Sequence, residues 1–215
     1  MVESERVPTA LGDCAQRGQS TLVPETVSLA DGRHVVVRPI CPRDADRLQA
    51  FFAALSPRSR QRRFHLGLNT LSQAVLRSLT EVDYYHHVAL VALAENDDGE
   101  LTIVAEARYV LLSDCCDVEF AIAVADDWQG FGLGAILLRL LGDHARLAGN
   151  GRLVGDLLAT NLPMRALVRK LGGRIASHPE AANLRRAIFD TVDLSTPTRF
   201  RAASTQAVTA NRNLG

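Results

Sequence analysis

The sequence predicts an α/β fold: one domain built on a mixed, mostly antiparallel sheet of six to seven strands flanked by helices. Apolar, β-branched runs of strand length alternate with segments whose apolar residues recur at helical spacing. Two long strand-like runs are joined by an Asp-Gly turn, which is typical of antiparallel hairpins. A glycine-rich turn then leads into a long helix, and only the two strands that flank this helix need a parallel crossover.

The first half of the domain reads as one strand followed by helices. Residues 1–26 mix Ser, Thr, Gly, Gln and charged residues without periodicity, so we expect a disordered arm there. Residues 195–215 have the same character and predict a flexible tail, which leaves residues 27–194 as the single domain. A β-branched run predicts the first strand, and apolar residues at helical spacing predict three helices: residues 33–40, then 45–55, 56–64 and 71–79.

The second half changes to strand periodicity and then alternates. Three strands are expected in an antiparallel meander: residues 88–94, 101–112 and 118–124. After the glycine-rich turn, the predicted order is helix, strand, helix, strand: residues 132–149, 153–158, 161–171 and 187–194.

Composition narrows the range of partners. The 24 basic and 24 acidic residues balance, so no global basic field favours nucleic acid. The four cysteines include no C-x-x-C pair, and we expect no metal site. The N-terminal residues lack the apolar stretch of a signal peptide, and no run of about 18 apolar residues occurs. We therefore expect a cytoplasmic protein without a membrane or nucleic-acid partner, and either a monomer or a homodimer.

The stretch VADDWQGFGLGA, residues 124–135, contains the most informative chemistry. Glycine permits positive φ, and its missing side chain lets another group lie directly on the backbone. The N–H groups of the first helical turn then point into this space, where they and the helix dipole favour an anion such as a pyrophosphate. The alternative is a plain tight turn with close packing between helix and strand.

Two classes of phosphate-bearing ligand compete for this turn. Gly130, Gly132 and Ala135 satisfy the dinucleotide pattern G-x-G-x-x-A, and Asp156 follows at about the distance expected for a ribose ligand. That motif normally belongs to successive parallel β-α units, whereas the strands predicted before this turn form hairpins. The context therefore favours another phosphate-bearing ligand.

The segment Gln129-Gly130-Phe131-Gly132-Leu133-Gly134 resembles the central signature of the GNAT superfamily of acyl-CoA-dependent N-acyltransferases. Residues 161–172 (NLPMRALVRKLG) resemble a later helix of that superfamily, and the likeness extends over about residues 27–194. Within it, the chain is most similar to the acetyltransferase domain of bacterial protein-lysine acetyltransferases. That similarity rests on Leu55-Ser56 with Arg63-Phe64, on Glu119-Phe120-Ala121, and on Asn161 with Met164.

The resemblance implies acetyl-CoA as cosubstrate and no metal. The pyrophosphate would lie on backbone N–H groups of the glycine-rich turn, the thioester oxygen near residues 122–124, and the pantetheine arm beside Asn161. Asn161 has an equally good alternative as a helix N-cap. The residues expected to bind the cofactor are Ile122, Ala123, Val124, Gln129, Gly130, Phe131, Gly132, Leu133, Gly134, Ala135 and Asn161.

Glu119 is the candidate general base, because it is the one carboxylate in an otherwise apolar strand. In a partly apolar cleft its pKa would rise, which suits a base that deprotonates an amine directly or through water. The alternative is a glutamate on the solvent face of the strand. The family resemblance favours an N-acetyltransferase acting on a primary amine, possibly a protein lysine. A small-molecule amine acetyltransferase, or a non-catalytic acyl-CoA-binding regulatory module, are the alternatives.

Four arginines, Arg58, Arg60, Arg62 and Arg63, lie on the second predicted helix. They either bind an anionic ligand, namely an acidic substrate surface or the CoA 3'-phosphate, or form a solvated helix face.

Overall fold

The computed structural model describes residues 22–64, 71–112 and 116–194. In these segments the chain forms one sheet of eight strands in the order β1-β2-β3-β4-β5-β6-β8-β7. The strands are β1 (Glu25–Ser28), β2 (His34–Pro39), β3 (His87–Glu95), β4 (Leu101–Leu111), β5 (Asp117–Val124), β6 (Arg152–Leu158), β7 (Arg174–Ser177) and β8 (Leu184–Asp190). The helices are α1 (Ala45–Ala54), α2 (Pro57–Phe64), α3 (Gln73–Thr80), α4 (Leu133–Leu147) and α5 (Leu162–Lys170).

The predicted α/β class and the mixed, mostly antiparallel sheet are confirmed. Strands β1 to β5 form a continuous antiparallel meander. The turn between β3 and β4 contains Gly99 at φ +80°, as an Asp-Gly hairpin requires. Strand β6 is parallel to β5 and is reached through α4, whereas β8 pairs with β6 and β7 in antiparallel fashion. The one parallel pair is the one expected from the sequence.

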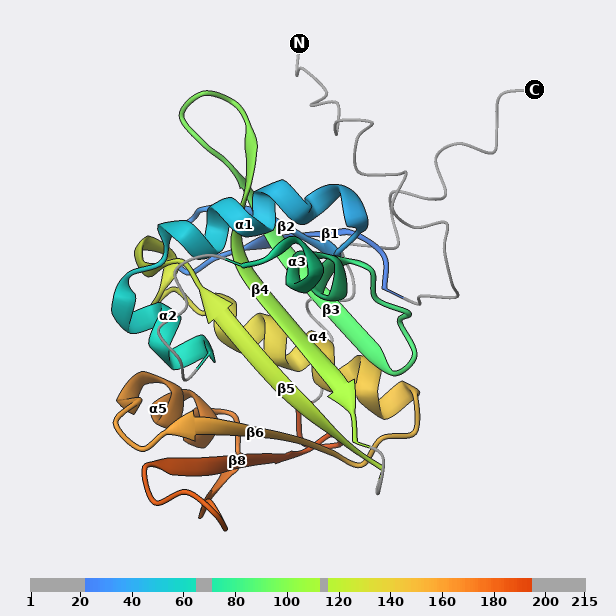
Figure 1. Cartoon of the computed structure of the whole chain (residues 1–215), viewed down its shortest axis with the longest axis vertical. Helices are drawn as coiled ribbons and strands as arrows, with labels where there is room; N and C mark the ends of the chain where they lie inside the picture. The colour runs from blue at the N-terminus through green and yellow to red at the C-terminus, as the bar shows by residue number, and fades with distance from the viewer. Residues whose placement is uncertain (1–21, 65–70, 113–115, 195–215) are drawn as a thin grey trace, which may run out of the picture.

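Helices cover the two faces of the sheet, as Figure 1 shows with α1 and α3 in front of the central strands and α4 behind them. The alternation along β3 separates the two cores: Leu90 packs with the α4 side chains, and Val91 packs with α1 and α3. Leu137 and Leu141 of α4 are fully buried against the sheet. In the described part of the chain, no helix combines the length and the apolar character needed to cross a membrane.

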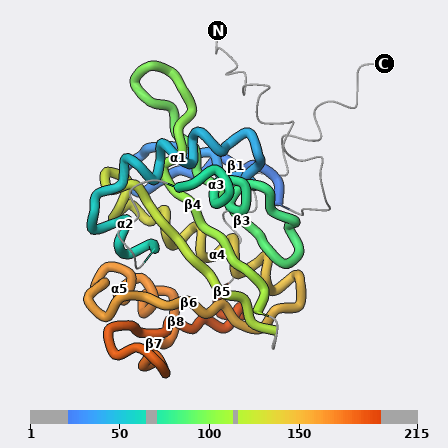
Figure 2. The backbone as a smooth tube through the Cα atoms, viewed as in Figure 1, coloured from blue at the N-terminus to red at the C-terminus, as the bar shows by residue number. Residues whose placement is uncertain are grey.

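The sheet has two more short strands than the single-sequence pattern indicates. Strand β1 pairs with β2 from Glu25 to Ser28, although only Val27 in it is buried. Strand β7 lies at the far edge beyond β8 (Figure 2), and none of its four residues is fully buried. Short edge strands carry almost no hydrophobic periodicity, so the expected count of six to seven strands was too low. The last strand also begins earlier than expected, at Leu184 rather than residue 187.

The sheet opens between β5 and β6. Their parallel ladder contains three residue pairs and ends at Glu119 opposite Val154. Beyond this point the two strands diverge toward α2 and α5, as Figure 1 shows. Gly155 lies where they part, and a Cβ atom there would come within 2.7 Å of the Phe120 ring and 2.9 Å of the Phe120 carbonyl oxygen. A glycine therefore lets the Phe120 ring and backbone lie directly on β6.

We expect Gly155→Ala to destabilise the fold by about 1–3 kcal/mol, because the added methyl group overlaps a ring and a backbone oxygen at once. The melting temperature should fall by roughly 3–10 °C in a thermal unfolding experiment. Gly151→Ala is the matched control, since nothing lies within 4 Å of its Cβ position and the variant should melt like the wild type. Equal melting temperatures for the two variants would contradict this account of the strand separation.

Candidate active site

A cavity of about 530 Å³ lies where β5 and β6 separate. Strand β5 forms one wall from Glu119 to Val124, and Gly155 and Asp156 of β6 with α5 form the opposite wall. The glycine-rich turn and the first residues of α4 close one end, and Arg62 and Arg63 of α2 border it on the face that carries α1 to α3. Segments distant in sequence therefore meet around one cleft.

The structure brings nearly all of the expected site residues to this cavity. Its lining includes Glu119, Ile122, Ala123, Val124, Gln129, Gly130, Gly132, Leu133, Gly134, Ala135 and Asn161. Phe131 is the exception, because its ring lies under the guanidinium of Arg33, 4.5 Å away. Their roles in binding a cofactor stay a prediction.

The glycine-rich turn has the geometry of an open anion-binding loop. Gly130 and Gly132 have φ values of +88° and +94°, and Gly132 is the N-cap of α4 without a side-chain cap. Nothing lies within 4 Å of the Cβ position of either glycine. The first N–H groups of α4 thus have no side-chain cap and lie beside open space, which is the arrangement that favours an anion.

The turn is fastened to α2 through Asp126. Its carboxylate accepts hydrogen bonds from the Ser56 N–H, from the Ser56 hydroxyl and from the Ser59 hydroxyl, at 2.8–2.9 Å. Partial burial raises the pKa of Asp126, but these hydrogen bonds outweigh it and hold the pKa below its usual value. Gln129 adds to the connection by donating from its amide to Ser59 Oγ at 3.2 Å and to the Val124 carbonyl at 3.0 Å.

Arg33 fixes the other side of the same turn. Its guanidinium lies 4.0 Å from the centre of the Trp128 ring and donates to the Asp127 carbonyl at 3.3 Å. Asp31 in turn pairs with Arg33 at 2.5 Å. Trp128 therefore anchors the turn to the hairpin between β1 and β2 through a cation–π contact with Arg33. The amino-acid sequence alone does not indicate this contact.

Asn161 is the N-cap of α5, because its side chain accepts a hydrogen bond from the Met164 N–H at 3.3 Å. It is 8 % exposed and lines the cavity. The capping role is therefore present, and a contact with a pantetheine arm stays a prediction compatible with it.

Glu119 is exposed at the mouth of the cavity, at the last paired position of β5 with β6. Strand alternation places it on the same face as Ala121 and Ala123. The Glu119 side chain reaches solvent, and apolar residues such as Ala121 and Ile122 line the same cavity. Its charge nevertheless acts on the neighbouring strand: the Asp156 carboxylate, and after it Glu119, raise the pKa of Arg186.

Asp156 lies on the opposite wall and is held by two basic side chains. It pairs with Arg186 at 2.9 Å and with His178 at 3.0 Å. Burial raises the pKa of Asp156, but these partners outweigh it and lower the pKa overall. The carboxylate that matched a ribose ligand in the dinucleotide pattern is thus committed to a protein ion pair.

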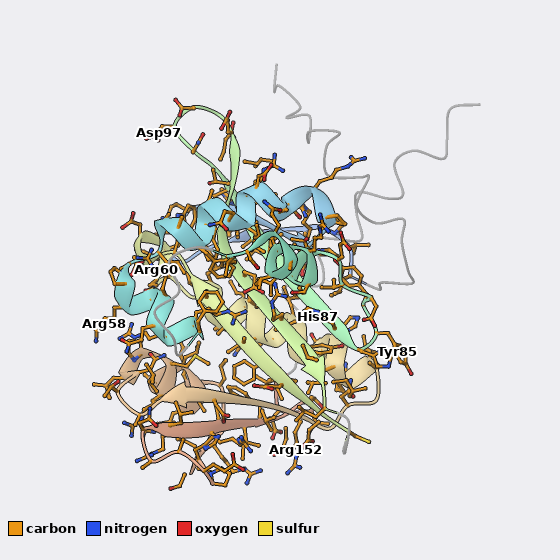
Figure 3. The ribbon with its side chains drawn as sticks, viewed as in Figure 1. Arg58, Arg60, Tyr85, His87, Asp97 and Arg152 are labelled. Atoms are coloured by element: carbon orange, nitrogen blue, oxygen red, sulfur yellow. The ribbon has the colours of Figure 1, made fainter. Side chains whose placement is uncertain are left out.

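Arg62 and Arg63 line the cavity, but the helical pattern alone could not distinguish them from Arg58 and Arg60. The side chain of Arg63 is only 10 % exposed and pairs with the fully buried Glu106 of β4. Arg58, by contrast, is exposed on the outer side of α2 and points away from the sheet (Figure 3). In the described segments, no group of three or more metal-ligating side chains occurs.

Comparison with known proteins identifies the family. The model of the "Acetyltransferase (GNAT) family" matches residues 57–173, which span β3 to β6, the glycine-rich turn and the helices that border the cavity. The chain belongs to the GNAT family. It is accordingly an acetyl-CoA-dependent acetyltransferase, and the dinucleotide alternative is wrong.

The relatives agree with this family. The chain is 41 % identical to the acetyltransferase PA5475 of Pseudomonas aeruginosa over 145 residues, which cover 67 % of this chain and 77 % of that protein. It is 31 % identical to the acetyltransferase Pat of Mycolicibacterium smegmatis over 73 % of this chain, but spans less than half, 46 %, of that longer protein. Among solved structures, the GNAT domain of S. lividans PAT superposes with a TM-score of 0.70 at 27 % identity, covering 78 % of this chain and 96 % of that domain.

We expect Asp126→Asn to lower the free energy of unfolding by about 1 kcal/mol at neutral pH, because the variant lacks the charged acceptor of three hydrogen bonds. The effect is small because solvent reaches this carboxylate. A group with a lowered pKa stabilises the fold above its unfolded pKa and loses this effect as the pH falls. The difference from the wild type should therefore shrink below about pH 4 in urea unfolding. Asp127→Asn, at the neighbouring exposed carboxylate, is the control and should leave the stability unchanged at both pH values.

Proposed function

We propose that this acetyltransferase moves the acetyl group of acetyl-CoA directly to a primary amine, with Glu119 as the general base. The observation that carries the proposal is the position of Glu119: it lies where β5 and β6 part, in the same cavity as the open glycine-rich turn. A base and an anion-binding turn at two ends of one cleft suit a ternary complex of amine, thioester and enzyme.

The cosubstrate is proposed to lie along β5. Its pyrophosphate binds the N–H groups at the start of α4, where Gly130 and Gly132 leave room for it. Beyond Glu119, β5 has no ladder partner on the β6 side, so backbone groups there are available to pair with the amides of pantetheine as a strand would. A backbone N–H near Ile122 donates a hydrogen bond to the thioester oxygen as negative charge develops on it.

The chemistry needs a neutral amine. A lysine ammonium has a pKa near 10.4 and is mostly protonated at neutral pH, so it first gives a proton to Glu119, directly or through water. The amine nitrogen then forms a bond to the thioester carbon, the C–S bond breaks, and the nitrogen loses its second proton to solvent as the amide forms. The CoA thiolate is a tolerable leaving group because a thiol pKa lies near 8.5, and it takes its proton from solvent. No covalent enzyme intermediate is required.

A protein lysine is the proposed acceptor, because the sequence resembles the acetyltransferase domain of bacterial protein-lysine acetyltransferases. A small-molecule amine is the second candidate, since a cavity of about 530 Å³ falls in the range of small-ligand sites. An acyl-CoA-binding module without turnover is the third. An acceptor panel of proteins, peptides and small amines, followed through release of free thiol, separates the three.

We expect Glu119→Gln to lower kcat by about 10²- to 10⁴-fold while the affinity for acetyl-CoA stays within about threefold of the wild type. The residual rate of the variant should rise with pH, because a larger fraction of the amine is then already deprotonated. Steady-state thiol release from pH 6 to pH 10 measures both effects. Wild-type turnover in Glu119→Gln would exclude the general-base role.

We also expect Gly132→Ala to weaken CoA binding about tenfold, because a methyl group enters the space over the helix N-terminus and positive φ disfavours alanine. Gly149→Ala is the matched control: Gly149 also has positive φ, at +85°, with open space around it, but lies outside the cavity lining. Both variants should lose about 1 kcal/mol of stability, and only Gly132→Ala should lose affinity in calorimetric titration with CoA. Equal affinities would contradict the placement of the pyrophosphate.

A further inference from the structure

A buried cluster of charged side chains lies between α2 and the face of the sheet that carries Glu119. Glu106 of β4 is completely buried and accepts hydrogen bonds from two guanidinium groups, those of Arg108 and Arg63. His87 of β3 joins the cluster through Arg108, with 2.9 Å between Nη1 of Arg108 and Nε2 of the imidazole. Strand register places Glu106 opposite Ala123 of β5, so the cluster lies beside the cavity wall.

The cluster carries an excess positive charge. Two guanidinium groups stand against one carboxylate, because burial and the charge of Arg108 lower the pKa of His87 to about 4 and leave its ring neutral at physiological pH. Asp83 also acts electrostatically on His87, but its carboxylate is half exposed and is held by three backbone N–H groups. One buried positive charge is therefore uncompensated among these groups, which is costly unless an anion accompanies it.

The guanidinium groups of Arg108 and Arg63 differ in how many of their N–H groups make hydrogen bonds. Arg108 makes bonds from Nε and from both terminal nitrogens, to Glu106, His87 and the Leu79 carbonyl. Arg63 makes one long bond to Glu106 at 3.4 Å, and its buried Nε has no hydrogen-bond partner within the described segments. Two other arginines there, Arg38 and Arg165, also have an unpartnered Nε, but neither lines the cavity.

We propose that Arg63 is a specificity-determining residue that binds a carboxylate group of the substrate inside the cavity. The guanidinium of Arg63 is planar, and its Nε–H has no hydrogen-bond partner within the described segments, so it can donate a hydrogen bond to a carboxylate oxygen. Glu106 and the rings of Phe52 and Phe64, 5.9 and 5.1 Å from the guanidinium, hold Arg63 in place. The carboxylate belongs either to the acyl group, as in a dicarboxylic acyl-CoA, or to the amine acceptor, as in an amino acid. This inference rests on the proposed function.

Two titrations distinguish the sources. In the first, acetyl-CoA and succinyl-CoA are titrated into wild type, Arg63→Gln and Arg58→Gln. In the second, CoA-loaded enzyme is titrated with a panel of amino acids and with the matching amides. Arg58→Gln is the control because it removes the same charge from the exposed side of α2 and outside the cavity lining.

The wild type should discriminate in favour of the carboxylate-bearing ligand in one of the two titrations, and Arg63→Gln should lose this preference by about tenfold to a hundredfold. Arg58→Gln should keep it. Affinity for acetyl-CoA itself should be equal in the wild type and Arg58→Gln. A preference in the first titration places the carboxylate on the acyl group, and one in the second places it on the acceptor.

Arg63→Gln leaves Glu106 paired with Arg108, so its buried charges balance and we expect it to fold. If it melts early, Arg63→Lys retains the charge without the planar fork and should show a partial loss of the same preference. A folded variant with the wild-type preference, or a wild type with no preference in either titration, overturns the proposal. Failure of the wild type to bind acetyl-CoA at all would instead overturn the proposed function.

Discussion

The separation of β5 from β6 is the constraint on which the rest of the site depends. Three ladder pairs hold the parallel strands together at one end, and the strands then part at Glu119 and Val154. The separation leaves one edge of β5 without a strand partner and creates the cavity between α4, α5 and the two strands. Gly155 is part of this geometry, because the Phe120 ring and carbonyl occupy the space of its missing side chain.

Charge is distributed unevenly around this opening. The carboxylates of Glu119 and Asp156 lie on β5 and β6, whereas the guanidinium groups of Arg62 and Arg63 border the cavity from α2. Asp156 forms an ion pair with Arg186 and contacts the imidazole of His178. Glu119 is exposed, so its carboxylate is accessible from solvent. The cavity is thus bordered by a carboxylate on β5, that of Glu119, and by the guanidinium groups of Arg62 and Arg63 on α2.

Much of this architecture could be predicted from the sequence, because long elements have clear periodicity. The meander, the helix after the glycine-rich turn and the single parallel crossover were all correct. The short strands β1 and β7 were missed, since edge strands with one buried residue or none carry little pattern. Arg63 could not be separated from Arg58 either: both lie in one arginine-rich helix, and only the tertiary position of Glu106 distinguishes them. The strand that carries Glu119 was predicted, but the exposure of its side chain depends on packing that no local pattern encodes.

The hydrogen bonds of Asp126 and Gln129 to α2 limit how this protein can evolve. Ser56 and Ser59 hold the turn between β5 and α4, and Ser59 also lines the cavity from α2. Substitutions can accumulate at the outward positions of α2, where Arg58 lies outside the cavity lining. A change at either serine would instead disturb the turn at the far end of the cleft. Diversification of the cavity wall that α2 forms is therefore restricted by the need to keep the glycine-rich turn in place.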